Sequence, residues 1–441
     1  HMSWTGGNFL RLLKQIKKKM IFSTLCLVFI IYILFFNFKY EATIFVRNKI
    51  WSLLYAHILK PILFQLDPEW CHDTFIFLGS FIGSFKIGQL LLKFFFGYEN
   101  SSCLALTING IQYQNPLGLG AGFDKNGQLM PTMSAIGFGF EEVGSMTGEP
   151  CAGNPKPRLF RLPYSKSLGV WYGLKNVGVE KVSQDLTQFD ESNLIKSKKN
   201  RFPYGVSIAA TNSPNTASVE GAVADFKKAY IYSKKHGIFT TINISCPNSY
   251  QADAFCDDIH RLETLLETIH QQRIKDNDEN RIIYIKLKAQ LTHSKIDAIL
   301  VLVKKYNIQG LVCCNLLKNA NREIHNIDQR DVIPKHGGLS GKVLQKITNE
   351  MIAYIYRKTE SWESPPIIIG IGGIFTGQDA YDKICAGASL LQMVSGLIFH
   401  GPSIVSEIKQ ELCALLKKDG YHNISQAIGS IHQKNKIYEN V

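Results

Sequence analysis

The chain has no CxxC pair, and none of its ten cysteines stands at a spacing from histidine that is typical of zinc ligands. The sequence therefore predicts neither a zinc site nor a disulfide framework. Scattered thiols of this kind fit a reducing compartment. The neighbours Cys313 and Cys314 lie in an apolar run, and we interpret them as buried thiols.

Beyond its N-terminus the chain also lacks a basic stripe with interleaved aromatic residues, although its formal net charge is +13. A positive balance suits either nucleic acid or an anionic membrane. The positive charge is dense in residues 11–19, where lysine and arginine occur without an acidic residue. This segment is similar to the start of a mitochondrial presequence. We therefore expect membrane targeting and no nucleic-acid partner.

The apolar run Ile21–Phe38 is not followed by an A-x-A cleavage site, which disfavours a removed signal peptide. Its length is near the lower limit for crossing a bilayer. We expect residues 20–38 to form a single-pass anchor after a basic targeting segment, residues 1–19, which begins with the cloning remnant His1-Met2. A cleaved signal peptide is the alternative.

Residues 48–97 form a second apolar region with helical spacing. Pro61 and the Asp67-Pro68 pair predict breaks, so we expect two short helices, the second over about Asp73–Phe96. Three glycines weaken that second helix. Such helices can lie in a membrane interface with one apolar face. Packing on the main domain is the alternative.

Residues 103–432 repeat a pattern of strand, glycine or polar loop, and helix. Apolar strands that alternate with helices predict parallel pairing, so we expect an α/β fold, a (β/α)8 TIM barrel. A doubly wound open sheet is the alternative, although it usually carries one glycine-rich fingerprint after its first strand. The expected strands are Pro116–Ala121, Phe140–Ser145, Tyr204–Ala210, Phe239–Ser245, Ile282–Lys288, Gly310–Asn315, Pro366–Gly372 and Ser389–Ser395, and the expected helices include Val219–His236, Ile259–Ile274, His293–Tyr306, Lys342–Lys358, Gln378–Ala386 and Pro402–Lys418.

The stretch Thr241–Ser249 ends one of these strands with a concentration of polar groups. Asn243 and Asn248 can bracket a planar ligand. Cys246 can supply a base or a nucleophile. A strand end with polar caps and a small buried cysteine is the alternative.

The carboxyl ends of barrel strands form the active face of such folds. Two lysines, several glycine loops and two amides fall at these ends. Backbone N–H groups at glycine turns and helix starts bind phosphate. Flavin mononucleotide (FMN) fits this set, with its phosphate at Gly372-Gly373 and its ring over the barrel mouth. The residues at the strand ends are Gly120 to Lys125, Ser145, Asn243, Cys246, Lys286, Asn315, Gly372, Gly373, Ser395 and Gly396.

Several motifs, taken together and in order, resemble those of class 2 dihydroorotate dehydrogenases, the membrane-bound, quinone-linked flavoenzymes of pyrimidine synthesis. The resemblance covers about residues 60–432 and extends to Asp67–His72 in the helical region, which forms a quinone tunnel in class 2. The motifs are Asn115–Gly127, Gly137–Gly144, Gly153–Arg161, Asn243–Asn248, Gly337–Gly341, Gly370–Gly377 and Ala427–Gly429.

This resemblance implies a monomer in the mitochondrial inner membrane that oxidises dihydroorotate to orotate through FMN and passes the electrons to ubiquinone. The implied base is Cys246, and His72 and Arg161 would border the quinone path. The implied substrate-binding residues are Lys125, Asn243, Asn248 and Asn315, and the implied FMN-binding residues are Gly120, Ala121, Gly122, Lys125, Ser145, Asn243, Lys286, Gly341, Gly372, Gly373, Met393, Val394 and Ser395.

Cys246 departs from the class 2 pattern, which has serine at this place. A free thiol has a pKa of about 8.5, far below that of a hydroxyl. We expect Lys125 and Lys286 to lower it further, which would make Cys246 a competent base. A bystander cysteine is the alternative.

Other departures remove polar contacts from the expected substrate site. Val170 stands where the family has an asparagine, and Leu316 where it has a threonine. Each unpaired group on the ligand would cost roughly 1–3 kcal/mol. Either Lys175 or Asn176 compensates, or the substrate is a related ring, or the chain keeps its flavin without this activity. Further departures are Ser207, Ala209, Ala210 and Val394.

Overall fold

The computed structural model describes residues 41–98, 102–194, 202–249 and 254–433. The expected targeting segment and transmembrane anchor, residues 1–38, lie outside these ranges. The chain divides into two compact units, His1–Trp51 and Ser52–Val441. Helix α2 (Glu41–Leu54) begins in the first unit, and all other elements below belong to the second.

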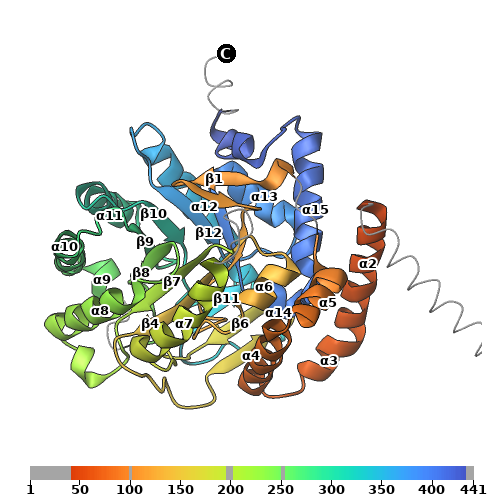
Figure 1. Ribbon diagram of the computed structural model, residues 1–441, viewed down its shortest axis with the longest axis horizontal. Helices are drawn as coiled ribbons and strands as arrows, with labels where there is room; N and C mark the ends of the chain where they lie inside the picture. Colours follow the sequence, from red (N-terminus) through yellow and green to blue (C-terminus); the bar gives the residue numbers. More distant parts are fainter. Residues whose placement is uncertain (1–40, 99–101, 195–201, 250–253, 434–441) are drawn as a thin grey trace, which may run out of the picture. The chain divides into compact units, whose positions relative to one another are not determined.

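Within the described ranges, eight parallel strands close into a barrel in the order β10-β12-β13-β3-β4-β7-β8-β9 (Figure 1). The late strand β13 closes it against the early strand β3, with Leu391 beside Leu117. The expected TIM barrel is confirmed, and the open sheet is excluded. Every expected strand overlaps one in the barrel: β3 (Leu117–Leu119), β4 (Phe140–Thr147), β7 (Tyr204–Ala209), β8 (Phe239–Asn243), β9 (Ile282–Leu287), β10 (Gly310–Cys313), β12 (Ile367–Ile371) and β13 (Leu390–Met393).

Several helices begin where a short polar side chain caps their free N–H groups. Ser218 accepts a hydrogen bond from Gly221 N at the start of α8, and Thr292 accepts one from Lys295 N at the start of α11. The six expected helices are confirmed with small shifts at their ends. The helices around the barrel are α6 (Met130–Ile136), α7 (Val179–Leu194), α8 (Val219–Ser233), α9 (Ala254–Asp257), α10 (Ile259–Lys275), α11 (His293–Lys305), α12 (Gln345–Thr359), α13 (Gly377–Ala386), α14 (Ser395–His400) and α15 (Ser403–Lys418).

Two small antiparallel sheets accompany the barrel and were not predicted. Strands β1 (Leu106–Ile108) and β2 (Ile111–Tyr113) form a hairpin. Strands β5 (Leu159–Leu162), β6 (Ser167–Val170) and β11 (Gly338–Gly341) form a three-stranded sheet with β6 in the middle. Residues of all three strands line the pocket described below.

The helices before the barrel differ from the expectation. Pro61 does not end a helix, since helical residues continue without a break through it to the end of α3 (Lys60–Leu63). A π-helical turn, Tyr55–Leu59, joins α2 to α3. The break at Asp67-Pro68 is confirmed, since Asp67 caps α4 (Pro68–Ser84) by accepting from Trp70 N at 2.8 Å.

The expected helix Asp73–Phe96 is in fact α4 followed by α5 (Lys86–Phe96), with a bend of 112° between them. The glycines of α4 allow a close approach to α6 (Figure 1). A Cβ at Gly83 would lie 2.3 Å from Thr132 Oγ1, and Thr132 Oγ1 donates to Gly79 O at 2.6 Å. One side of α4 therefore packs on the main domain, as the alternative interpretation held.

The same two helices expose large apolar side chains elsewhere. Phe77 is 69% exposed, Ile87 73% and Leu90 66%. In the described part of the chain no single helix is long and apolar enough to cross a membrane, whereas the bent pair α4–α5 meets the criteria of length and composition. The exposed face fits the expected interfacial helices.

Candidate active site

A pocket with about 1240 Å³ of empty space, part of it open to solvent, lies at the carboxyl ends of the barrel strands. It is lined by residues at the ends of β3, β4, β8, β9, β10, β12 and β13 and by residues of the β5-β6-β11 sheet, as expected for this fold. It brings together all of the expected site residues except Gly120 and Arg161, namely His72, Ala121, Gly122, Lys125, Ser145, Asn243, Cys246, Asn248, Lys286, Asn315, Gly341, Gly372, Gly373, Met393, Val394 and Ser395.

The two exceptions lie just beyond the lining. Gly120 packs behind it, where its N–H donates to Met393 O at 3.2 Å and a Cβ would lie 2.7 Å from Ile371 Cδ1. Arg161 donates to Leu66 O at 2.6 Å, and its guanidinium lies 4.8 Å from the centre of the Phe64 ring. Arg161 therefore ties β5 to the end of α3.

Polar side chains from four strand ends form a connected cluster on one side of the pocket. Asn243 Nδ2 donates to Ser145 Oγ at 2.9 Å, and Ser145 shares a hydrogen bond of 2.7 Å with Ser207. Asn315 Nδ2 donates to Asn243 Oδ1 at 3.3 Å and to Ser245 O at 3.0 Å. Each amide is thereby held in one orientation, which suits recognition of a planar polar ring.

Asn248 contributes a free acceptor to the same side. Its Nδ2 donates to Val170 O at 3.0 Å, while its buried Oδ1 has no partner among the described residues. An unpaired buried acceptor is costly and indicates a ligand donor. The backbone of Val170 thus orients Asn248, although its side chain offers no polar contact.

Cys246 lines the pocket next to these amides. Burial raises the pKa of its thiol to about 11, although the Asn248 N–H and Lys286 oppose the shift. Lys286 therefore acts in the expected direction, but the expectation that the pKa of Cys246 falls below its usual value is wrong, because loss of solvent outweighs the attraction of this cation.

Lys125 also lines the pocket, with Nζ 3.9 Å above the centre of the Tyr172 ring. Burial lowers the pKa of Lys125 to about 8, although Asp73 opposes this. Lys175 also lines the pocket, yet its Nζ is held 3.0 Å from Glu69 Oε1 and 3.2 Å from Asp73 Oδ2. It is therefore not free to replace a missing substrate contact.

Asn176 is no replacement either, since it lies outside the pocket lining. Its Nδ2 donates to Thr147 Oγ1 at 2.7 Å, and its Oδ1 accepts from Gly178 N at 2.8 Å. Lys175 and Asn176 are thus both engaged elsewhere, and neither replaces the polar contacts missing at Val170 and Leu316.

The floor of the pocket is a buried polar layer inside the barrel. Gln392 Nε2 donates to Glu142 Oε2, and Gln392 Oε1 has no partner among the described residues. Burial lowers the pKa of Lys286, while the neighbouring Glu142 opposes this. The floor therefore offers a cation and an acceptor to a ring above it. Gln392 was missed, although a glutamine inside the apolar strand β13 is a usable signal of a buried polar role.

The far end of the pocket is a glycine cradle formed by the loops after β11, β12 and β13. Gly372 and Gly373 have φ angles of +107° and +72°, which favour glycine. Ser340 and Ser395 share a hydrogen bond of 2.9 Å across this end. The N-terminus of α13, the helix that follows this cradle, is already engaged, because Gly377 N donates to Glu411.

His72 joins the pocket to the helices before the barrel. Its Nε2 lies 2.8 Å from Phe123 O and its Nδ1 3.1 Å from Asp73 Oδ1. Burial and the nearby Lys125 lower the pKa of His72, so it is neutral near pH 7. An apolar cluster lies on the other side of the pocket and reaches the end of α3; it consists of Leu168, Phe375 and Phe399 with Phe64, Val170 and Ile398 packed against it.

Comparison with known proteins gives one consistent family. The profile of the dihydroorotate dehydrogenase family matches residues 103–416. The chain is 33% identical over 389 residues to the dihydroorotate dehydrogenase (quinone) of Trichodesmium erythraeum, covering 85% of this chain and 98% of that protein. It is 30% identical over 381 residues to the mouse dihydroorotate dehydrogenase (quinone), mitochondrial, covering 86% and 91%.

Solved structures agree with the sequence comparisons. The crystal structure of DHODH in complex with ferulenol from Eimeria tenella superposes with a TM-score of 0.73 at 26% identity. The superposition covers 83% of this chain and 96% of that one. The similarity therefore extends over the barrel and beyond it.

Proposed function

The chain belongs to the dihydroorotate dehydrogenase family, and we propose on this premise that it oxidises dihydroorotate to orotate in pyrimidine synthesis, with a quinone as the final electron acceptor. The observation that carries the proposal is the amide cluster of Asn243, Asn248 and Asn315 beside Cys246, in one pocket with Lys125 and Lys286. These groups can bind a planar ring that carries amide groups and a carboxylate.

The residues present fit FMN, which is the cofactor we infer for this pocket. Gly372 and Gly373 form a cradle in which a Cβ at either position would meet Leu344 or Gln345 at 3.0 Å or less. Lys286 and the unpaired Gln392 Oε1 offer a cation and an acceptor to the ring. When bound, FMN accepts a hydride from C6 of dihydroorotate and hands the electrons on to the quinone.

The protein's own part in the reaction is to hold the substrate and remove the proton from C5. Asn243, Asn248 and Asn315 fix the ring plane, and Lys125 faces the substrate carboxylate. Cys246 takes the C5 proton onto its sulfur in the thiolate form, which Lys286 stabilises electrostatically. Lys286 is buried, which strengthens its interaction with the thiolate.

The quinone path runs, in this proposal, between the helices before the barrel and the pocket. His72 and Arg161 border it, and the apolar cluster around Phe399 and Phe64 provides an apolar wall. The exposed apolar face of α4 and α5 would lie in a membrane, and ubiquinone would enter from there. A mitochondrial inner membrane location and a monomeric state complete the proposal.

The test is anaerobic addition of dihydroorotate to the purified, yellow, flavin-loaded protein, followed by the flavin absorbance. We expect bleaching, and return of the colour on addition of a ubiquinone analogue. A folded, flavin-loaded protein that stays yellow would contradict the proposal. It would favour a non-catalytic relative or an oxidoreductase that acts on another ring.

A further inference from the structure

A buried ion pair connects helix α4 to the loop before β5. Arg158 donates from Nε to Glu69 Oε2 at 3.0 Å and from Nη2 to Glu69 Oε1 at 2.8 Å. Glu69 is 3% exposed and Arg158 is 6% exposed. Two parallel hydrogen bonds fix the guanidinium in one plane and one position. Glu69 therefore sets the orientation of Arg158.

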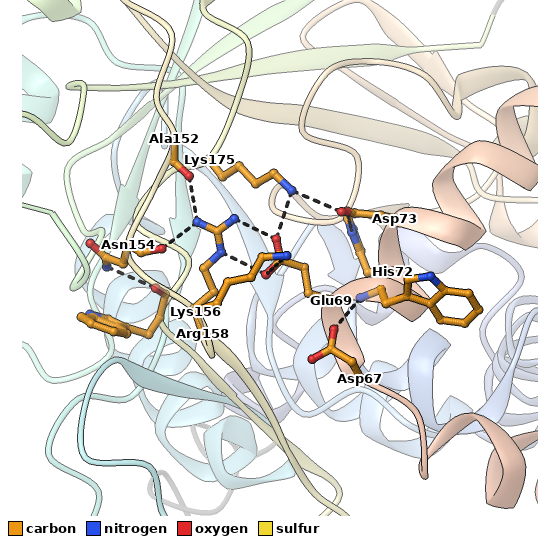
Figure 2. Close-up of polar contacts among 11 residues, drawn as sticks. Asp67, Glu69, His72, Asp73, Ala152, Asn154, Lys156, Arg158 and Lys175 are labelled. Atoms are coloured by element: carbon orange, nitrogen blue, oxygen red, sulfur yellow. Dashed lines mark hydrogen bonds and ion pairs between the residues drawn. The ribbon is translucent and has the colours of Figure 1, made fainter.

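The remaining face of Arg158 shapes the loop that precedes it. Nη1 donates to Ala152 O at 2.8 Å and to Asn154 O at 2.7 Å, and Figure 2 shows Arg158 between these carbonyl groups and Glu69. Glu69 and the two carbonyl groups together engage four of the five N–H donors of the guanidinium, so another arrangement would give up hydrogen bonds. The ion pair thus fixes the backbone position of Asn154.

Asn154 in turn connects this loop to the substrate side of the pocket. Its Nδ2 donates to Trp171 O and to Asn248 O, both at 3.1 Å. Its backbone N–H donates to Tyr172 O at 3.0 Å. The side chain of Asn154 is therefore hydrogen-bonded to two segments. One segment contains Tyr172, and the other is the loop that contains Cys246 and Asn248.

Glu69, Arg158 and Asn154 all lie outside the pocket lining, so none of them is placed to touch a substrate. Their hydrogen bonds nevertheless form an unbroken series from α4 to Asn248. The end of the series is the residue whose Oδ1 is unpaired in the pocket. A shift of that loop would move the acceptor and the thiol together.

We propose that Asn154 is a positioning residue for the substrate loop, held in place by the ion pair between Arg158 and Glu69 of helix α4. This rests on the proposed function, in which Cys246 and Asn248 act on the substrate. The helix that carries His72 on the quinone side thereby also determines the geometry on the substrate side.

The decisive variant is Asn154→Asp, which keeps the shape of the side chain but replaces the donor with a carboxylate facing two carbonyl oxygens. We expect flavin reduction by dihydroorotate to slow on the order of 100-fold, since a misplacement of about 1 Å has that effect. Dissociation of FMN, followed by its fluorescence, and reoxidation of the reduced protein by a ubiquinone analogue should keep their wild-type rates. A general loss of structure would change all three.

The matched control is Lys156→Ala. Lys156 Nζ lies 3.7 Å from Glu69 Oε2, its side chain is 65% exposed, and it is not part of the series to Asn248. We expect wild-type reduction kinetics in this variant. Arg158→Lys keeps the charge but loses the two parallel hydrogen bonds to Glu69, so it should slow flavin reduction as Asn154→Asp does.

A second measurement does not depend on the reaction. Hydrogen–deuterium exchange of the FMN-loaded protein should be faster at Ser245 and Asn248 in Asn154→Asp than in Lys156→Ala. Unchanged exchange together with unchanged reduction would overturn the inference while leaving the proposed function intact. A wild-type protein that is not reduced, but whose Asn154→Asp variant shows the faster exchange, would contradict the proposed function and retain the positioning role.

Discussion

Asn248 donates a hydrogen bond of 3.0 Å to the carbonyl oxygen of Val170, so a backbone group orients the substrate-side amide. A valine at position 170 can make this contact as well as any other residue. The loss of a polar side chain there removes a ligand contact but keeps the orientation of Asn248. The orientation of Asn248 is therefore independent of the departure at Val170.

The unpaired Oδ1 of Asn248 predicts a hydrogen bond from the substrate. Asn248→Ala should raise the KM for dihydroorotate on the order of tenfold or more, because the ring N–H would lose its acceptor. Steady-state kinetics with a saturating quinone analogue measure this. A KM equal to that of the wild type would show that Asn248 does not contact the substrate.

The raised pKa of Cys246 predicts an alkaline dependence of flavin reduction. With a pKa of about 11, the thiolate fraction rises about tenfold for each pH unit between 7 and 10. Stopped-flow reduction at saturating dihydroorotate should follow that slope. Cys246→Ala should be slower by about 100-fold or more and should lose the slope; a slope that persists in this variant would assign it to another group.

Lys125 predicts weaker binding of dihydroorotate at alkaline pH. Its pKa of about 8 means that the ammonium is present below pH 8 and is lost above it. If it faces the substrate carboxylate, the KM for dihydroorotate should rise above about pH 8. Lys125→Met should show a high KM at every pH. A wild-type KM that stays constant from pH 7 to 9.5 would rule out this role.

The glycine cradle predicts that a single added methyl group at Gly373 reduces flavin binding. A Cβ at Gly373 would lie 2.5 Å from Gln345 Cβ and 2.6 Å from its Cα, and the φ of +72° adds strain. Gly373→Ala should therefore purify with little flavin. The control is Gly420→Ala, where φ is +78° but no heavy atom lies within 4 Å of the added Cβ. Equal flavin content in both variants would contradict a cofactor contact at Gly373.

The ion pair of Glu69 predicts a specific loss of stability in acid. Burial alone would raise the pKa of Glu69, but hydrogen bonds from Arg158 and Lys175 lower it from 4.5 to about 2. Between pH 4.5 and about pH 2, the unfolded chain therefore binds more protons at Glu69 than the folded protein does. The stability that Glu69 contributes is present above pH 4.5 and is lost as the pH falls to about 2. The difference in unfolding free energy between wild type and Glu69→Gln should shrink over that interval.

Urea titrations at several pH values measure this difference. A suitable comparison is Asp185→Asn, which removes the exposed Lys181–Asp185 pair at 2.6 Å. Exposed pairs contribute about 0–1 kcal/mol, so its effect should be small at every pH. A Glu69→Gln difference that does not change with pH would contradict the strongly lowered pKa.

The barrel was predictable because its strands and helices are local in sequence. Runs such as Phe239–Asn243 and amphipathic stretches such as Ile259–Lys275 carry their period in neighbouring residues. The helix boundaries before the barrel were less predictable. Proline usually ends a helix at interior positions, whereas helical residues continue through Pro61, which follows the π-helical turn Tyr55–Leu59.

The pocket residues at strand ends were predictable from the fold and from the family motifs. What could not be predicted was the environment of each group. The sign of the Cys246 pKa shift depends on burial by segments far along the chain, and the fixation of Lys175 depends on Glu69 and Asp73, about a hundred positions earlier. The series of hydrogen bonds from Glu69 to Asn248 likewise joins residues that are far apart in the sequence, so no local pattern indicates it.

The closure of the barrel by β13 against β3 has a consequence during synthesis. The edge of β3 stays unpaired until Leu390–Met393 has left the ribosome, which at roughly 5–20 residues per second takes on the order of ten seconds or more after β3 itself emerges. An apolar strand edge exposed for that time is a site for wrong pairing and for chaperone binding. Nascent chains that end before Met393 should therefore associate with chaperones, and full-length chains should release them.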